Sequence, residues 1–222
     1  MIALLVMTDG RGDCLARSVA SFDRLHGPIT QRVIHDDSGS RGYARHLAEN
    51  YPGWEIVSTG RRAGFAGAYR SAWRWLRSHC TTNWVFSTED DFVVTQDVNL
   101  SEMAAVMQFR PHMAQMALLR QAWNEQETAA GGIVQMHPGD YHDASDGTHH
   151  WLQHRRFFTT NPHLLRTEFV RDHVWPEGSQ SEGRFGVQLF NTEPATVCGF
   201  WGRRDDPPRV EHIGTVRIGT GY

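Results

Sequence analysis

Short apolar runs alternate with longer amphipathic segments in the N-terminal part of the chain. Residues 2–7 are continuously apolar, which predicts a strand buried on both faces of a sheet. Similar runs predict further strands at residues 31–35, 54–58 and 84–87. Between these strands, apolar positions at helical spacing predict helices over residues 13–25 (with Asp13 as the N-cap), 41–50 and 64–79.

This order of elements predicts the fold class. Strands that alternate with helices form an open α/β sheet that is doubly wound, largely parallel and flanked by helices. Ligands of such sheets bind beyond the carboxyl ends of the strands. Polar clusters follow three of the predicted strands, at residues 8–11, 36–40 and 89–91. We therefore expect these clusters to meet at one edge of the sheet and to form a binding site.

The pattern is less regular in the second half of the chain. It predicts a helix at residues 101–110 capped by Ser101, strands at 113–119 and 150–160, and a short helix within 162–173. The segment 124–147 is polar and rich in glycine, which is typical of a mobile loop. No linker separates the halves, so we expect a single domain over residues 1–222, made of halves 1–95 and 96–222.

The amino-acid composition excludes several classes of protein. A hydrophobic fraction of 40% with 11% aromatic residues excludes a disordered tail, and a net charge of −3 argues against a generally basic nucleic-acid binder. The 22 basic residues are all arginine, which indicates a codon bias first and phosphate recognition second. Three scattered cysteines and the lack of a long apolar run favour a cytoplasmic protein with no membrane partner.

The triplet Glu89-Asp90-Asp91 is the most informative of the polar clusters. It directly follows the predicted strand at residues 84–87. Adjacent carboxylates repel one another and favour a cation between them, and Mn²⁺ and Mg²⁺ prefer oxygen ligands. For an arbitrary acidic triplet a solvated turn is the more frequent explanation, but its place at the carboxyl end of a buried strand favours a metal site.

Two other clusters suggest a nucleotide. The loop Thr8-Asp9-Gly10-Arg11-Gly12 lets backbone approach a ligand closely, although it lacks the dinucleotide-binding and P-loop patterns. The run from Asp36 and Asp37 to Ser40 offers carboxylates to a base or ribose, with Asp36 facing the ligand and Ser38 or Ser40 capping a helix. Arg61 and Arg62 precede a helix start that contains Gly67, which favours an anion or reflects a tight packing contact.

In this order the four motifs resemble glycosyltransferase family 2 enzymes of the GT-A fold. The likeness covers residues 1–95 well and is thinner afterwards; Glu89 stands where the family usually has Asp, and Tyr69-Arg70 where it usually has Arg-Asn. The resemblance implies a nucleotide-sugar donor, most readily a UDP-sugar, held by the residues of the N-terminal half: Thr8, Asp9, Gly10, Arg11, Asp36, Asp37, Arg62, Gly67, Glu89 and Asp90. It also implies Mn²⁺ or Mg²⁺ on Asp91 and His212.

The resemblance further implies a base in the acceptor-side half, residues 96–222. We favour Glu182 over Glu177, because an amphipathic helix resumes at residue 185. The expected reaction is a metal-dependent, inverting sugar transfer to an acceptor hydroxyl. The arginine pairs at 61–62, 155–156 and 203–204 suggest a hydroxymethylated base in phage-type DNA, in a host cytoplasm, and saccharide or protein hydroxyls are the other acceptors.

Three alternatives stay open at this point. A nucleotidyltransferase on a related sheet would use Arg11 in place of a catalytic lysine. A non-catalytic nucleotide-sugar-binding module would share the donor site without the base. The histidines between residues 137 and 150 suggest zinc, but their spacing is irregular and no cysteine joins them, so an acceptor-side loop is the preferred interpretation.

Overall fold

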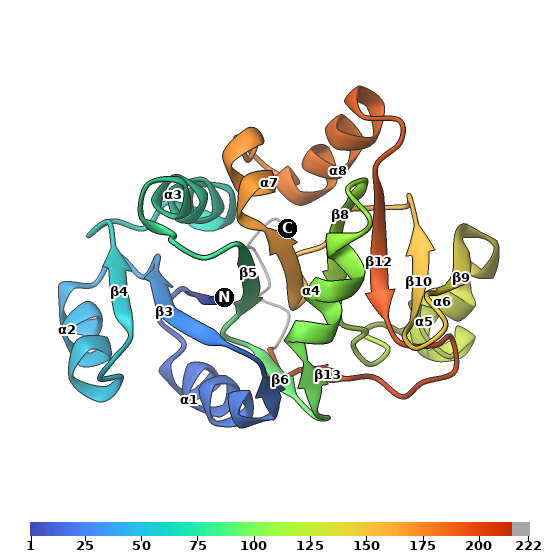
Figure 1. Ribbon diagram of the computed structural model, residues 1–222. Helices are drawn as coiled ribbons and strands as arrows, with labels where there is room; N and C mark the ends of the chain where they lie inside the picture. The colour runs from blue at the N-terminus through green and yellow to red at the C-terminus, as the bar shows by residue number, and fades with distance from the viewer. Residues whose placement is uncertain (215–222) are drawn as a thin grey trace.

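The computed structural model describes residues 1–214. Within these residues, nine strands form one mixed, mostly parallel sheet flanked by helices, which confirms the predicted fold class (Figure 1). Among the nine, β11 and β10 run against the others. The order across the sheet is β4 (Glu55–Ser58), β3 (Ile29–Asp36), β1 (Ile2–Thr8), β5 (Trp84–Glu89), β11 (His163–Arg166), β8 (Met113–Ala117), β12 (Val197–Trp201), β10 (His150–His154) and β9 (Tyr141–Ser145).

Helices cover both faces of this sheet because its central strands are apolar on both sides. In β1, Ile2, Leu4 and Val6 join one hydrophobic core, and the alternate residues Ala3, Leu5 and Met7 join the other. The first core includes residues of α1 (Gly12–Ala20), α2 (Arg41–Asn50) and α4 (Leu100–Gln108). The second includes residues of α3 (Gly64–His79), α7 (Thr167–Asp172) and α8 (Ser181–Thr192).

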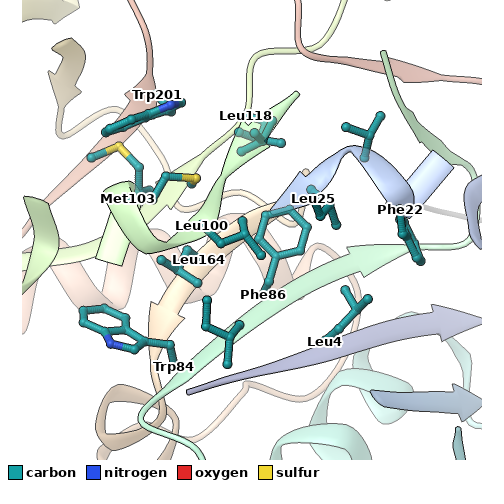
Figure 2. Packing of buried hydrophobic residues seen from close by; sticks show 14 of the residues in the cluster. Leu4, Phe22, Leu25, Trp84, Phe86, Leu100, Met103, Leu118, Leu164 and Trp201 are labelled. Carbon is teal, nitrogen blue, oxygen red and sulfur yellow. The ribbon is translucent and has the colours of Figure 1, made fainter. Parts of the chain in front are cut away.

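The first core crosses the boundary between the two halves of the chain. Figure 2 shows Leu4 and Phe86 from the N-terminal strands beside Leu100 of α4 and Leu164 of β11. Phe86 and Leu100 are fully buried, so each contributes about 1.5–3 kcal/mol through the apolar area it removes from water. The sheet and its core therefore fix where the second half lies relative to the first.

Two small ribbons complete the path of the chain near the acidic triplet. The 3₁₀ helix η1 (Ser21–Arg24) leads into β2 (Leu25–His26), which pairs with β7 (Val98–Asn99). More important for the site, β6 (Phe92–Val94) pairs antiparallel with β13 (Val210–His212). Through this pairing a C-terminal segment returns to the edge where the triplet lies. No helix in the described part of the chain is long and apolar enough to cross a membrane.

Residues 124–147 are not the long loop that their composition predicted. They form α5 (Glu125–Ala130), α6 (Ile133–Met136), the 3₁₀ helix η2 (Pro138–Asp140) and the edge strand β9. Asn124 caps α5 by accepting a hydrogen bond from the Glu127 amide, and Gly131 ends it in the left-handed region. A small third core around Tyr141, Leu152 and Phe200 holds β9 in place. The elements are short, so their apolar periodicity is too brief to detect in the sequence.

Two expected helix caps are also wrong. Asp13 lies inside the first turn of α1, and Arg11 occupies the cap position without a side-chain hydrogen bond. At α4 the cap is Asn99, whose side chain accepts from the amides of Ser101 and Glu102. In both helices the chain enters one or two residues earlier than the pattern indicates. At α4 two neighbouring residues, Asn99 and Ser101, are both suitable caps, whereas α1 begins without a side-chain cap.

Candidate active site

The three polar clusters meet at one edge of the sheet, as expected. In the register of the central strands, Thr8 of β1 lies beside Asp36 of β3, and Met7 lies beside Glu89 of β5. Beyond the last strand residues, the Asp37 amide donates to the Thr8 carbonyl at 2.8 Å, and the Asp90 amide to the Met7 carbonyl at 2.8 Å. The carboxyl ends of three parallel strands thus place the polar residues within one site.

Arg11 is the cation of this site. Its guanidinium donates to the carboxylates of both Asp90 and Asp91, and its Nε lies 3.1 Å from Asp9 Oδ1. On the other side of Asp90, Thr8 donates its hydroxyl to Oδ2 at 2.6 Å. Asp90 is therefore held on both sides within the protein, because buried carboxylates need such partners.

Asp91 keeps one oxygen without a partner. Its Oδ2 lies 3.1 Å from Nε2 of His212, whereas the buried Oδ1 has no hydrogen-bond partner among the described residues. The chain passes over this carboxylate: the Ile213 amide donates to the Asp91 carbonyl at 2.8 Å, and a side chain at Gly214 would collide with the carboxylate itself. A buried carboxylate with one unpartnered oxygen, Oδ1, and an imidazole beside the other, Oδ2, has an environment that suits a metal ion.

Asp91 and His212 are the two side chains here that could hold a metal ion. Within residues 1–214, no three His, Cys, Asp or Glu side chains are grouped so as to hold a metal ion. Mn²⁺ and Mg²⁺ retain positions for phosphate and water, so the pair Asp91 and His212 fits a metal that a diphosphate also binds. The described histidines of residues 137–150 likewise form no zinc cluster, and two of them, His142 and His150, belong to the strands β9 and β10.

The carboxylates after β3 face inward. Asp36 does not point toward a ligand as expected: it is fully buried, and it accepts hydrogen bonds from the Ser38 amide at 2.8 Å and the Ser58 hydroxyl at 3.0 Å. Asp37 accepts from the amides of Ala63 and Gly64 at 2.9 and 2.8 Å. The two acids thereby tie the loop after β3 to the start of α3, and Ser40 caps α2 by accepting from Tyr43.

The glycines and arginine of this region also hold loops together. Gly10 has a φ of 104°, which only glycine adopts without strain, and Gly67 packs where a side chain would collide with the Ala63 Cβ, 2.6 Å away. This contact is with the N-cap residue of the same helix, so Gly67 allows the tight start of α3. Arg62 donates to Asp9 Oδ2 at 2.6 Å, so it borders the loop after β1.

Glu182 lies in the first turn of α8, apart from Asp91 and His212. Its Oε1 accepts hydrogen bonds from the Thr160 amide at 2.6 Å and the Thr160 hydroxyl at 3.1 Å. It lines a cavity of about 700 Å³ between the first turns of α3 and α8. Glu177 lines the same cavity but is exposed and pairs with Arg70 at 2.8 Å. A half-buried carboxylate with one oxygen fixed beside a cavity has the environment of a base.

Comparison with known families accounts for this arrangement. Residues 5–173 match the model of Glycosyl transferase family 2. The chain belongs to this family. The match spans β1 through α7 and so contains the acidic triplet, although it ends before Glu182 and His212. Comparison with curated protein sequences gave no significant match.

Solved structures share the GT-A fold of this family 2 chain. They include TarS 1–349 of S. aureus in complex with UDP-GlcNAc, with a TM-score of 0.63 at 14% identity, and the mannosyltransferase PcManGT of Pyrobaculum calidifontis in complex with GDP-Man and Mn²⁺, with 0.61 at 14%. GalNAc-T7 with UDP, GalNAc and Mn²⁺ has a TM-score of 0.67 at 10% identity. The alignments cover 97–98% of this chain but only 59%, 58% and 43% of those chains, respectively.

The three carboxyl groups of the triplet Glu89-Asp90-Asp91 have different pKa values, because each has different surroundings in this family 2 chain. Burial raises the pKa of Glu89 to about 8, helped by the nearby charges of Asp91 and Glu182, and burial raises the pKa of Asp90 to about 7 despite Arg11. Burial also acts on Asp91, but the His212 hydrogen bond and Arg11 outweigh it and lower its pKa. Asp91 is therefore the member of the triplet that stays a carboxylate most readily.

Several residues that support the site gave no signal in the sequence. Tyr69 donates its hydroxyl to Glu89 at 3.0 Å, and Thr160 holds Glu182. Gln121 exchanges two hydrogen bonds with the His212 backbone, each of 2.9 Å, and the Trp123 ring lies 3.9 Å from the imidazole. Each is an ordinary residue type in an ordinary pattern, and only its tertiary contact reveals its position at the site.

Proposed function

We propose that this chain is a metal-dependent, inverting glycosyltransferase that moves a sugar from a nucleoside-diphosphate donor to an acceptor hydroxyl. The supporting observation is the Asp91 carboxylate, which stays ionised between Arg11 and His212 while its Oδ1 is unpartnered. This environment occurs at the carboxyl edge of the sheet, where ligands of α/β proteins bind. Because the chain aligns with about half of the relatives' length, the reaction itself remains a proposal.

In this proposal Asp91 and His212 hold Mn²⁺ or Mg²⁺. When bound, the ion would offset the negative charge that develops on the departing diphosphate. Arg11 keeps the two aspartates close together without the ion, since its guanidinium donates to both carboxylates. The donor, most readily a UDP-sugar, then lies along Thr8, Asp9, Gly10 and Arg62, with Asp36, Asp37, Gly67, Glu89 and Asp90 shaping the loops around it.

Glu182 is the proposed base. Its carboxylate takes the proton of the acceptor hydroxyl, whose oxygen forms a bond to the anomeric carbon of the donor. The bond from that carbon to the diphosphate oxygen breaks, and the nucleoside diphosphate leaves with the electron pair. Attack opposite the leaving group inverts the anomeric configuration. The Thr160 hydrogen bonds hold one oxygen of Glu182 in place, which leaves the other for the acceptor.

Two of the three arginine pairs, 155–156 and 203–204, lend little support to a DNA acceptor. Arg155 donates to the carbonyls of Pro194 and Thr196, and Arg156 pairs with Asp140. Arg204 pairs with Asp143 at 3.1 Å, and Arg203 bonds to His150 at 2.8 Å. Guanidinium groups that already have protein partners contribute less to phosphate binding. We therefore do not favour a hydroxymethylated DNA base over other acceptors, and it is tested beside them.

Donor binding tests the proposal directly. Thermal-shift titrations with UDP-GlcNAc, UDP-glucose and GDP-mannose, with and without Mn²⁺, should show stabilisation that needs both components. Slow release of nucleoside diphosphate should accompany it. Asp91→Asn should lose both effects and stay folded. Asp143→Asn, which alters the edge strand β9, should retain them.

Other outcomes would favour another class. Pyrophosphate release from a nucleoside triphosphate would indicate a nucleotidyltransferase. Binding of a nucleotide sugar without hydrolysis or transfer would indicate a non-catalytic module. Full metal-dependent turnover in Asp91→Asn would reject the assigned metal ligand.

A further inference from the structure

The cavity beside Glu182 has the size and lining of a small-molecule site. Its volume is about 700 Å³, within the range of ligand pockets. The first turns of α3 and α8 form two walls, and residues 177–180 form a third. Most of the lining residues are glycine, alanine or serine, so backbone groups rather than bulky side chains face the space, with Phe65 as the one aromatic ring in the lining.

The cavity lies on the acceptor side if Glu182 is the base. Glu182 belongs to its lining, whereas Asp91, His212 and Arg11 do not, and Gly67 at the start of α3 borders both this cavity and the proposed donor site. A base must contact the hydroxyl that it deprotonates, so the acceptor has to reach Glu182 from a space that the nucleotide and metal leave free. This step rests on the proposed function.

An ion pair inside the cavity offers specific recognition. Arg70 Nη1 lies 2.8 Å from Glu177 Oε1, and the Glu177 carbonyl accepts from Arg184 at 2.8 Å, which fixes the backbone of the pair. The Glu177 side chain is 78% exposed, so its carboxylate has room for further hydrogen bonds. Adjacent hydroxyls of a sugar match such a pair, since one donates to the carboxylate while the next accepts from the guanidinium.

The charges select against an anionic acceptor. The ionisable residues of the lining are Arg70, Glu177 and Glu182, so two acids face one guanidinium that is already paired. The first-turn amides of α3 and α8 attract anions, but a phosphate or carboxylate bound here would lie beside two acids that repel it, so the balance of side-chain charge disfavours it. We propose that the cavity between α3 and α8 is the acceptor site for a neutral saccharide, and that Arg70 and Glu177 bind its hydroxyl groups.

Acceptor kinetics test this inference. Wild-type protein with Mn²⁺ and the donor identified by thermal shift is offered p-nitrophenyl glycosides of neutral mono- and disaccharides, a glycosyl phosphate, and an oligonucleotide with hydroxymethylcytosine. We expect transfer to a neutral glycoside. Glu177→Gln and Arg70→Met should raise the KM for that glycoside about tenfold or more, the loss typical of a charge-assisted hydrogen bond, while kcat falls less than about threefold.

A second ion pair provides the matched control. Arg204 and Asp143 lie 3.1 Å apart with side-chain exposures of 27% and 67%, close to the 29% and 78% of Arg70 and Glu177. Asp143→Asn removes a comparable surface pair outside the cavity lining, so the acceptor KM should equal that of the wild type.

The outcomes separate the two proposals. Transfer to the oligonucleotide or the glycosyl phosphate alone, or a wild-type acceptor KM in Glu177→Gln and Arg70→Met, would overturn the saccharide site while leaving the glycosyltransferase proposal intact. Failure to bind or hydrolyse any nucleotide sugar would overturn both.

Discussion

His212 Nε2 lies 3.1 Å from Asp91 Oδ2, because the pairing of β13 with β6 returns the C-terminal segment to the acidic triplet. The imidazole is held between the Phe92 and Trp123 rings, whose centroids are 4.7 and 3.9 Å away. In the proposed site the two side chains bind the metal ion as a pair, so removing either one should lower the metal affinity.

Replacing His212 with alanine tests that pairing. We expect Mn²⁺ affinity in the presence of UDP to fall roughly 10- to 100-fold, the range found when groups around a metal are removed. Titration followed by electron paramagnetic resonance of free Mn²⁺ measures this. His142→Ala alters an exposed histidine of β9 and should leave the affinity unchanged. Equal affinities in the two variants would exclude His212 as a ligand.

Arg11→Met should weaken the fold more without metal than with it. The substitution leaves Asp90 and Asp91, with side chains 0% and 5% exposed, without their shared cation. Breaking a buried pair in this way costs about 3 kcal/mol of unfolding free energy. Mn²⁺ with UDP should recover part of it. Urea unfolding measures the difference, and Arg24→Met, which breaks an exposed pair with Asp97, should cost about 0.5 kcal/mol or less.

Thr160→Val should shift the pH dependence of turnover. Burial raises the pKa of Glu182, and the Thr160 amide and hydroxyl oppose that rise. Valine removes the hydroxyl and keeps the amide, so the pKa of Glu182 should rise further. A base acts when deprotonated, and the acidic limb of kcat should therefore move to higher pH. Thr160→Ser should restore it; an unmoved limb in the valine variant would indicate a base other than Glu182.

His154→Phe should stabilise the protein in acid. His154 is 2% exposed among the rings of Tyr141, Phe157 and Phe200, and burial lowers its pKa to about 4. The unfolded state then binds a proton below about pH 6.5 that the folded state refuses until about pH 4, so stability falls as the pH drops through that window.

The gain in stability from His154→Phe depends on the difference between the pKa of His154 in the unfolded and the folded state. Phenylalanine removes the titrating group and should recover up to about 3 kcal/mol near pH 4, with little change near pH 8. Urea unfolding at the two pH values measures the difference. The same gain at both pH values would show that packing, and not protonation, is responsible.

The N-terminal half was the more predictable part of the fold. The predicted helices at residues 41–50 and 64–79 agree with α2 and α3, because Ser40 and the Pro52-Gly53 pair mark boundaries and long apolar periodicity marks the elements. Residues 124–147 were misread since their helices and strand are only three to six residues long. Such short elements are stabilised by tertiary packing and carry no readable period.

The site shows a similar division. That Thr8, Asp36 and the triplet share an edge follows from strand order alone, because parallel strands end on the same side of a sheet. Which acid accepts which donor does not. Asp36 turns inward to Ser58, and Asp91 keeps an unpartnered oxygen, because of distances set by loops from separate parts of the chain.

The sequence by itself determined the alternation of strands and helices, the sheet they form and the residue types at its carboxyl edge, since these depend on local periodicity and connectivity. Only the tertiary structure decided that Arg11 bridges Asp90 and Asp91, that His212 faces Asp91 and that Thr160 holds Glu182. Those contacts join residues far apart in the chain. Their energies depend on burial and on distances of a few ångströms, which no local pattern encodes.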